Sequence, residues 1–234
     1  MKLYSAWYCP FAQRTWMSLL HKGVKFEYVE TDPYDKTKQW LDTSRQTGMV
    51  PVISPAKGNT IPGSTRIIEY LELAYPNAPK LYSVVPEENA EQKYWIDFIG
   101  EHITPYFYRF LKSQNTDDFQ LESKHKLIDA LSTMTQAMSE DGLYFNGNAI
   151  SAVDMMLFPF AYRIHLLLKF YKSFELPDQG QIWQRYNAWY NKMLKSQSFQ
   201  KSIGNAQNYD SRLIQFYLPY SLGGGQADVT VLPA

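Results

Sequence analysis

Residues Lys2–Gly23 read KLYSAWYCPFAQRTWMSLLHKG and contain the strongest structural signal in the chain. Leu3–Tyr8 has the apolar and aromatic content of a β-strand, and Cys9 follows it directly. Pro10 suits the first position of a helix, where its missing N–H would have no partner. Apolar residues then recur at helical spacing as far as Gly23, which is typical of a helix end. The stretch therefore predicts a strand, a tight corner at Cys9 and a helix.

The predicted corner gives Cys9 a particular chemical setting. A residue at a helix start lies beside unpaired backbone N–H groups and the positive end of the helix dipole. Such a setting stabilises the thiolate, which is the nucleophile in sulfur chemistry. A lone cysteine is more commonly a small buried hydrophobe, but the proline-initiated helix directly behind Cys9 favours redox catalysis.

Cys9 is also the only cysteine in the chain. An intrachain disulfide, a cysteine-based zinc site and an internal resolving thiol are therefore excluded. A catalytic Cys9 would form a mixed disulfide with an external thiol, and a second external thiol would release it. This monothiol chemistry suits a reducing, cytoplasmic environment.

The composition excludes several other classes of protein. The 234 residues carry 23 Lys and Arg against 23 Asp and Glu, so no overall field favours nucleic acid or an anionic membrane. The longest clearly apolar run, Met155–Tyr162, is far shorter than the roughly 20 residues of a membrane span. The N-terminus does not have the pattern of a signal peptide. The four histidines do not form a metal-binding spacing, and we expect no metal.

The elements expected after Gly23 complete a small α/β domain. Pro51 interrupts the third strand, and Ser64 is the expected N-cap of the last helix, which stops before Pro76. The order β-α-β-α-β-β-α is the thioredoxin-like arrangement. The segments expected after the first helix are a strand at Lys25–Glu30, a helix at Lys36–Ser44, strands at Met49–Ile53 and Thr60–Ile61, and the helix from Ser64.

The rest of the chain shows helical patterns and no convincing strand. Residues 76–86 contain three prolines, which indicate a linker. We therefore expect a thioredoxin-like domain over 1–76, a linker over 77–86, an all-helical domain over 87–218 and a mobile tail over 219–234. The expected helices are Glu88–Ser113, Gln120–Ser139, Ser151–Lys172 and Ile182–Lys195.

The helix at Ser151 has its own start signal. Ser151 and Asp154 have the spacing of a capping box, with Asp in place of Glu. Ile150 and Met155 stand at the hydrophobic-staple positions, and Pro159 is expected to kink the helix.

Two motifs carry a resemblance to a known family. Cys9-Pro10-Phe11-Ala12 with Arg14 resembles the CPF[AS]xR corner of omega-class glutathione transferases, which dehydroascorbate reductases and chloride intracellular channel proteins share. Residues 147–154, GNAISAVD, are similar to the capping motif in the helical domain of glutathione transferases. The resemblance runs from Leu3 to about Leu218. It implies the glutathione transferase fold: an α/β thioredoxin-like N-terminal domain followed by an all-α C-terminal domain.

The resemblance also assigns roles to matching residues. Cys9 would be the nucleophile that forms a mixed disulfide with glutathione, and Phe11 would pack beside it. Val50, before a cis-Pro51, would pair with the cysteinyl backbone of glutathione as an added β-strand does. Ser64, at a helix start, would bind the γ-glutamyl carboxylate.

Two positions depart from the family pattern. The lysine that meets the glycyl carboxylate is replaced by Thr37, and the flanking Lys36 and Lys38 are the expected glutathione-binding residues at this point. The acidic residue that pairs with the γ-glutamyl ammonium is replaced by Gly63. Loss of such a charge-assisted contact is expected to weaken glutathione binding roughly ten- to a hundredfold.

A second substrate is expected in a site between the domains. Arg163 matches a site-lining arginine of the family, and tyrosines of the helical domain are further candidates. The residues expected to contact this substrate are Tyr106, Arg109, Arg163, Tyr209 and Tyr217.

The resemblance implies a cytoplasmic, homodimeric enzyme, a glutathione-dependent thioltransferase that removes glutathione from mixed disulfides and reduces dehydroascorbate. Its partners would be glutathione, as co-substrate, and a small or glutathionylated disulfide substrate. The alternative is a non-catalytic binding protein, or a redox-responsive protein like the chloride intracellular channels. A binding protein would show no turnover that depends on Cys9.

Overall fold

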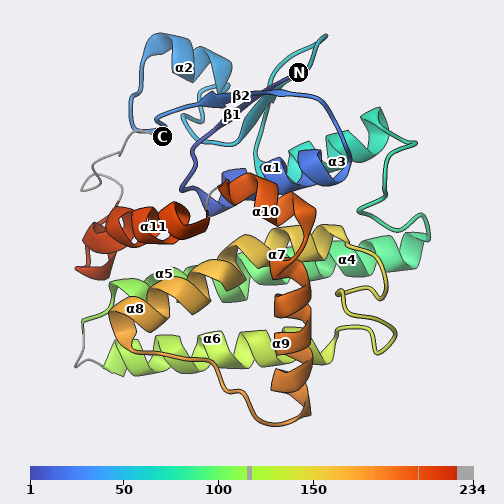
Figure 1. Ribbon diagram of the computed structural model, residues 1–234. Helices are drawn as coiled ribbons and strands as arrows, with labels where there is room; N and C mark the ends of the chain where they lie inside the picture. The colour runs from blue at the N-terminus through green and yellow to red at the C-terminus, as the bar shows by residue number, and fades with distance from the viewer. Residues whose placement is uncertain (115–117, 205, 226–234) are drawn as a thin grey trace. The chain divides into compact units, whose positions relative to one another are not determined.

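The computed structural model describes residues 1–114, 118–204 and 206–225 (Figure 1). The chain divides into two compact units. The first comprises Met1–Leu81 and Gln197–Gly204, and the second comprises Tyr82–Ser196 and the helix α11 (Ala206–Ser221). The division after Leu81 falls inside the linker expected at 77–86.

Two features differ from the expected domain limits. Helix α10 (Gln197–Ile203) lies within the range 87–218 assigned to the helical domain, but it belongs to the first unit, where it packs on α1 (Pro10–His21). Helix α11 continues to Ser221, beyond the expected limit at residue 218. Residues 226–234 of the expected tail lie outside the described residues.

The first unit has the predicted order of strands and helices. Its four-stranded sheet has the order β2-β1-β3-β4, in which β1 is parallel to β2 and antiparallel to β3, and β3 is antiparallel to β4. Helices α1 and α3 lie on one side of the sheet and α2 on the other (Figure 1). The elements besides α1 and α10 are β1 (Lys2–Ser5), β2 (Glu27–Glu30), α2 (Lys38–Thr43), β3 (Val52–Ser54), β4 (Ile61–Pro62) and α3 (Ser64–Ala74).

The corner at Cys9 is confirmed, although the strand before it is shorter than predicted. β1 ends at Ser5, and the N–H of Cys9 donates to the carbonyl of Ala6 at 2.9 Å in the turn that follows. Cys9 is the N-cap of α1, and Pro10 occupies the first helical position. Tyr8 lies in this turn rather than in β1, so strand alternation does not set its orientation.

The predicted stop of α1 at Gly23 is also confirmed. Gly23 has φ +66°, and its N–H donates to the carbonyl of Leu20, while the N–H of Val24 donates to that of Leu19. This pair of bonds is the Schellman motif, whose left-handed residue is normally glycine.

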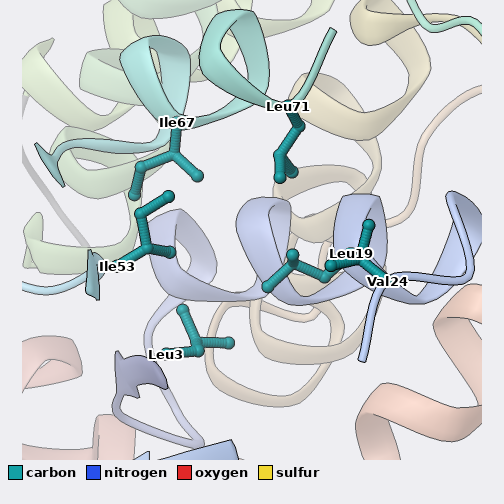
Figure 2. Close-up of a cluster of buried hydrophobic side chains, with 6 residues drawn as sticks. All are labelled: Leu3, Leu19, Val24, Ile53, Ile67 and Leu71. Carbon is teal, nitrogen blue, oxygen red and sulfur yellow. The ribbon is translucent and has the colours of Figure 1, made fainter. Parts of the chain in front are cut away.

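The core of the first unit lies between the sheet and the helices α1 and α3. Strand residues Leu3 and Ile53 face Ile67 and Leu71 of α3 (Figure 2). Leu19 of α1 and Val24, the two residues joined by the longer hydrogen-bonded loop of the Schellman motif, belong to the same cluster (Figure 2). The end of α1 is therefore packed into the core. Burial of these apolar side chains stabilises the packing of α1 and α3 on the sheet.

The second unit is built from helices. Within its described residues the only β-type pairing is an isolated bridge between Tyr144 and Gly147. Each of its two longest predicted helices continues through a π-helical segment, η1 or η2. The elements besides α11 are α4 (Pro86–Phe98), η1 (Ile99–Ile103), α5 (Thr104–Lys112), α6 (Asp118–Gln136), α7 (Ala152–Arg163), η2 (Ile164–Leu168), α8 (Lys169–Lys172) and α9 (Gln181–Leu194).

Helix α7 starts with the predicted capping box. The N–H of Ser151 donates to Asp154 Oδ2 at 2.7 Å, and the Ser151 hydroxyl accepts from the N–H of Asp154 at 3.5 Å. Pro159 lies inside the helix, as expected. None of the helices in the described ranges combines the length and apolarity that crossing a bilayer requires.

Candidate functional site

Cys9 stands where the backbone of α1 begins. It is partly exposed, and its carbonyl accepts the first intrahelical bond, from the N–H of Gln13 at 3.0 Å. Its side chain forms no capping hydrogen bond with the helix. Cys9 therefore occupies the N-cap of a twelve-residue helix, at the positive end of the helix dipole, and this position favours the thiolate.

Tyr8, directly before Cys9, is buried and remains protonated. Burial is the main cause that raises the pKa of its hydroxyl, and the negative charge of the Cys9 sulfur raises this pKa further. The ring is parallel to that of Tyr34, with centroids 6.5 Å apart. A neutral, desolvated hydroxyl at this position is poorly suited to act as a phenolate.

A cavity of about 310 Å³ lies next to this corner within the first unit. Cys9 itself does not line it, but Phe11, two residues further along α1, does. Its walls come from α1, from the segment before β3 and from the start of α3. The lining residues are Phe11, Arg14, Met49, Val50, Pro51, Gly63, Ser64, Thr65 and Arg66.

Val50 lines this cavity, and its backbone N–H and C=O groups have no hydrogen-bond partner within the described residues. The Val50–Pro51 peptide bond is cis, as the resemblance implied. Val50 is 7% exposed. Buried backbone groups are normally paired, so an extended ligand could take both bonds here.

The start of α3 forms another wall of the cavity. The N-cap is Gly63 rather than the predicted Ser64, and Ser64 is the first helical residue. Gly63 has no side chain to satisfy the first N–H groups of the helix. The Ser64 side chain is nearly buried, and its hydroxyl forms no hydrogen bond within the described part of the chain. This helix start is therefore a natural anion site.

Gly63 adopts φ +92°, a conformation that glycine reaches without strain. Its N–H donates to the carbonyl of Pro51 at 2.9 Å, which joins the start of α3 to the residue directly before β3. A Cβ atom built at this position would lie 2.6 Å from Nη2 of Arg66. The guanidinium of Arg66 thus occupies the space that a side chain at position 63 would enter.

The two predicted lysines do not line the cavity. The ammonium group of Lys36 donates to the carbonyl of Gly48, and Lys38 pairs with Asp42 at 2.8 Å on the exposed face of α2. Thr37 between them is the N-cap of α2 and accepts from the N–H of Trp40 at 3.2 Å.

The five residues expected to contact a second substrate all lie in the second unit, in two groups. Arg163 is fully buried, and its guanidinium donates to the carbonyl of Pro159 at 2.8 Å and to the hydroxyl of Tyr209 at 3.2 Å. Tyr217 contributes a further hydrogen bond to the same guanidinium. The other group is a pair in α5, where Arg109 lies 5.1 Å from the centre of the Tyr106 ring.

Sequence reasoning missed several residues of the cavity. Thr65 and Arg66 follow Ser64 in the first turn of α3, so their position next to a predicted anion site was the available signal. Arg14 was part of the quoted motif but had no assigned role. It is buried, with its guanidinium 4.9 Å from the centre of the Phe11 ring.

Comparison with known proteins identifies relatives of both units. The family described as glutathione S-transferase, N-terminal domain, matches residues 3–79. Glutathione S-transferase omega-1 of Rattus norvegicus is 30% identical over 168 residues, which cover 71% of this chain and 68% of the relative. The probable glutathione S-transferase DHAR1, cytosolic, of Oryza sativa subsp. japonica is 32% identical over 170 residues, 73% of either chain.

The fold is similar to that of a solved omega-class enzyme. The crystal structure of glutathione transferase Omega 3C from Trametes versicolor superposes with a TM-score of 0.80 at 30% identity. The match covers 94% of this chain and 89% of the other. An α/β thioredoxin-like unit followed by a helical unit is thus the arrangement that the two proteins share.

Proposed function

This chain belongs to the glutathione S-transferase family, and on that basis we propose that it is a glutathione-dependent thioltransferase that also reduces dehydroascorbate. The observation that carries the proposal is the position of Cys9 as N-cap of α1, next to a cavity suited to an extended peptide. Tyrosine- and serine-type transferases activate the glutathione thiol through a hydroxyl. A cysteine in this position forms a disulfide with it instead.

The cavity provides three kinds of contact for the tripeptide. The N–H and C=O of Val50 would pair with the cysteinyl backbone, and Phe11 would pack beside it. The N–H groups at the start of α3, with the Ser64 hydroxyl, would bind the γ-glutamyl carboxylate. Lys36 and Lys38 have partners elsewhere, so the glycyl carboxylate would reach them only if those bonds exchanged.

The reaction proceeds in two thiol–disulfide exchanges. The Cys9 thiolate attacks the glutathione sulfur of a glutathionylated substrate; the substrate S–S bond breaks, the Cys9–glutathione disulfide forms, and the substrate thiolate leaves and takes up a proton. A second glutathione thiolate then attacks the glutathione sulfur of this mixed disulfide. Oxidised glutathione leaves, and the Cys9 thiolate is regenerated.

Reduction of dehydroascorbate uses the same residues. Two glutathione molecules supply two electrons and two protons, and the products are ascorbate and oxidised glutathione.

Tyr106 is partly exposed and Arg109 is exposed, and these two residues are our first candidates for contacting the second substrate. Arg163 is buried, and we assign it the role of holding Tyr209 and Tyr217 in position. We place the enzyme in the cytoplasm, as a homodimer.

Intact-mass measurement after incubation with oxidised glutathione tests the proposal. Wild type is expected to gain one glutathione, the Cys9→Ser variant none, and added reduced glutathione should remove the adduct. Thermal melting of both proteins serves as the control for folding.

The opposite outcome is informative as well. If wild type remains unmodified under conditions that modify a known monothiol enzyme, glutathione is not its thiol. A protein that binds glutathione without any turnover dependent on Cys9 would be a binding module instead.

A further inference from the structure

The charge of the cavity next to Cys9 is one-sided. Of the described residues that line it, Arg14 and Arg66 carry guanidinium groups and none carries a carboxylate. Glutathione has a carboxylate and an ammonium group on the same carbon atom at its γ-glutamyl end. The guanidinium groups of the lining can pair with the carboxylate of glutathione, but the lining offers no negative charge to the ammonium group.

Arg66 is held close to the start of α3. Its Nε donates to the carbonyl of Pro62 at 2.8 Å, and the guanidinium forms no other hydrogen bond or ion pair within the described residues. Its Nη2 is the atom that a Cβ at Gly63 would meet, at 2.6 Å. Nη2 therefore lies next to Gly63, the N-cap of α3, so a guanidinium and a helix N-terminus are both available to an anion at this end of the cavity.

The same geometry disfavours an ammonium group. A cation at the start of α3 meets the positive end of the helix dipole and the guanidinium of Arg66. Gly63 has no side chain that could provide a counter-charge, and Arg66 fills the space into which one would extend.

We infer that the cavity recognises the carboxylate at the γ-glutamyl end of its thiol through Arg66 and the start of α3, and does not recognise the adjacent ammonium group. The inference rests on the part of the proposed function that places a glutathione-like thiol in this cavity. The ligand class is therefore wider than glutathione and comprises cysteinylglycine thiols acylated by a dicarboxylic acid, with or without an amino group beside the free carboxylate.

Two analogues of glutathione separate the two groups. Glutaryl-Cys-Gly lacks only the α-amino group, and 4-aminobutyryl-Cys-Gly lacks only the α-carboxylate. Dissociation constants are measured by calorimetry on the Cys9→Ser variant, so that no disulfide forms. We expect glutaryl-Cys-Gly to bind as tightly as glutathione or more tightly, and 4-aminobutyryl-Cys-Gly to bind about tenfold more weakly or worse.

Substitutions in the Cys9→Ser background locate the effect. Arg66→Gln is expected to weaken the binding of glutathione and glutaryl-Cys-Gly about tenfold each. It should not weaken the binding of 4-aminobutyryl-Cys-Gly, because the ammonium group of that analogue no longer meets a second cation. Lys57→Gln, which removes an exposed charge outside the cavity, is the matched control and should change none of the three. Thermal melting verifies that each variant is folded.

The outcomes distinguish this inference from the proposed function. If glutathione binds about tenfold more tightly than glutaryl-Cys-Gly, the inference is overturned, while Cys9-dependent turnover with glutathione would leave the proposed function intact. If the expected order of binding holds but wild type shows no Cys9-dependent turnover, the inference stands and the catalytic function falls. If none of the three thiols binds, both are overturned.

Discussion

The carboxylate of Asp154 accepts a 2.7 Å hydrogen bond from the indole nitrogen of Trp189, which joins α7 to α9 in the interior of the helical unit. The same carboxylate accepts bonds from the N–H of Phe145 and from the N–H and hydroxyl of Ser151. Burial raises the pKa of Asp154, and these donated bonds oppose the rise. The capping box is therefore also the point where three segments of the unit meet.

Asp154→Ala is expected to lower the free energy of unfolding by about 4 kcal/mol or more. It removes a cap and leaves the buried N–H groups of Phe145 and Trp189 without an acceptor. Urea denaturation measures the change, with Asp129→Ala on the exposed face of α6 as the matched control. A loss no larger than that of the control would show that the carboxylate does not hold these segments together.

Lys22 and Glu72 form a buried ion pair at 2.7 Å between α1 and α3 in the first unit. Lys22 also donates to the carbonyl of Pro79, and Glu72 accepts from the N–H of Leu81. Glu72→Ala is expected to cost about 3–5 kcal/mol of stability, because it leaves the buried ammonium unpaired.

The double variant Lys22→Met/Glu72→Leu distinguishes this cause from lost packing. It should recover most of the stability, since a buried pair is often replaceable by apolar side chains. Asp42→Ala, which breaks the exposed pair with Lys38, is the control and should not move the urea midpoint. Equal losses in the double and single variants would argue against an unpaired charge as the cause.

His165 makes the stability of the helical unit depend on pH. Burial is the main cause that lowers its pKa to about 4; Lys169 lowers it further, and Glu175 acts in the opposite direction. Its ring stacks on that of Tyr190, with the ring centroids 4.0 Å apart. His165 and Asp178 both line a second cavity, in the helical unit. In the unfolded chain the histidine titrates at about pH 6.5.

The folded state therefore takes up this proton later than the unfolded state as the pH falls. The stabilisation that neutral His165 provides is complete above about pH 6.5 and is lost progressively towards pH 4, by about 3 kcal/mol in total. His165→Phe keeps the aromatic stack and removes the titration. The free energy of unfolding, measured in urea at several pH values, should change less steeply with pH for the variant than for wild type between about pH 6.5 and pH 4. An identical dependence on pH in the two proteins would exclude His165 as the cause.

Tyr8→Phe is expected to leave thioltransferase activity and its pH profile nearly unchanged. Burial raises the pKa of this hydroxyl, so it carries no charge at neutral pH whose removal could matter. Steady-state kinetics with a glutathionylated peptide test this, with Cys9→Ser as the inactive reference. A loss of about a hundredfold, typical of a missing acid–base catalyst, would show that Tyr8 takes part in the reaction.

Features that depend on a few neighbouring residues could be predicted from the sequence. Cys9 as N-cap before Pro10, the glycine stop at Gly23 and the capping box at Ser151 all follow from local hydrogen bonding within one or two turns. The order of strands and helices in the first unit follows in the same way from periodicity and turn residues.

Pairings between residues far apart in the chain, and choices between neighbouring candidates for one role, became visible in the folded protein. Ser64 looked like the N-cap of α3, but the bond between Gly63 and Pro51 makes Gly63 the cap and leaves Ser64 in the cavity. The partners of Asp154 and Lys22 lie 35 and 50 residues away in Trp189 and Glu72. No local pattern identifies such pairs, because which buried donor meets which acceptor depends on how the elements pack.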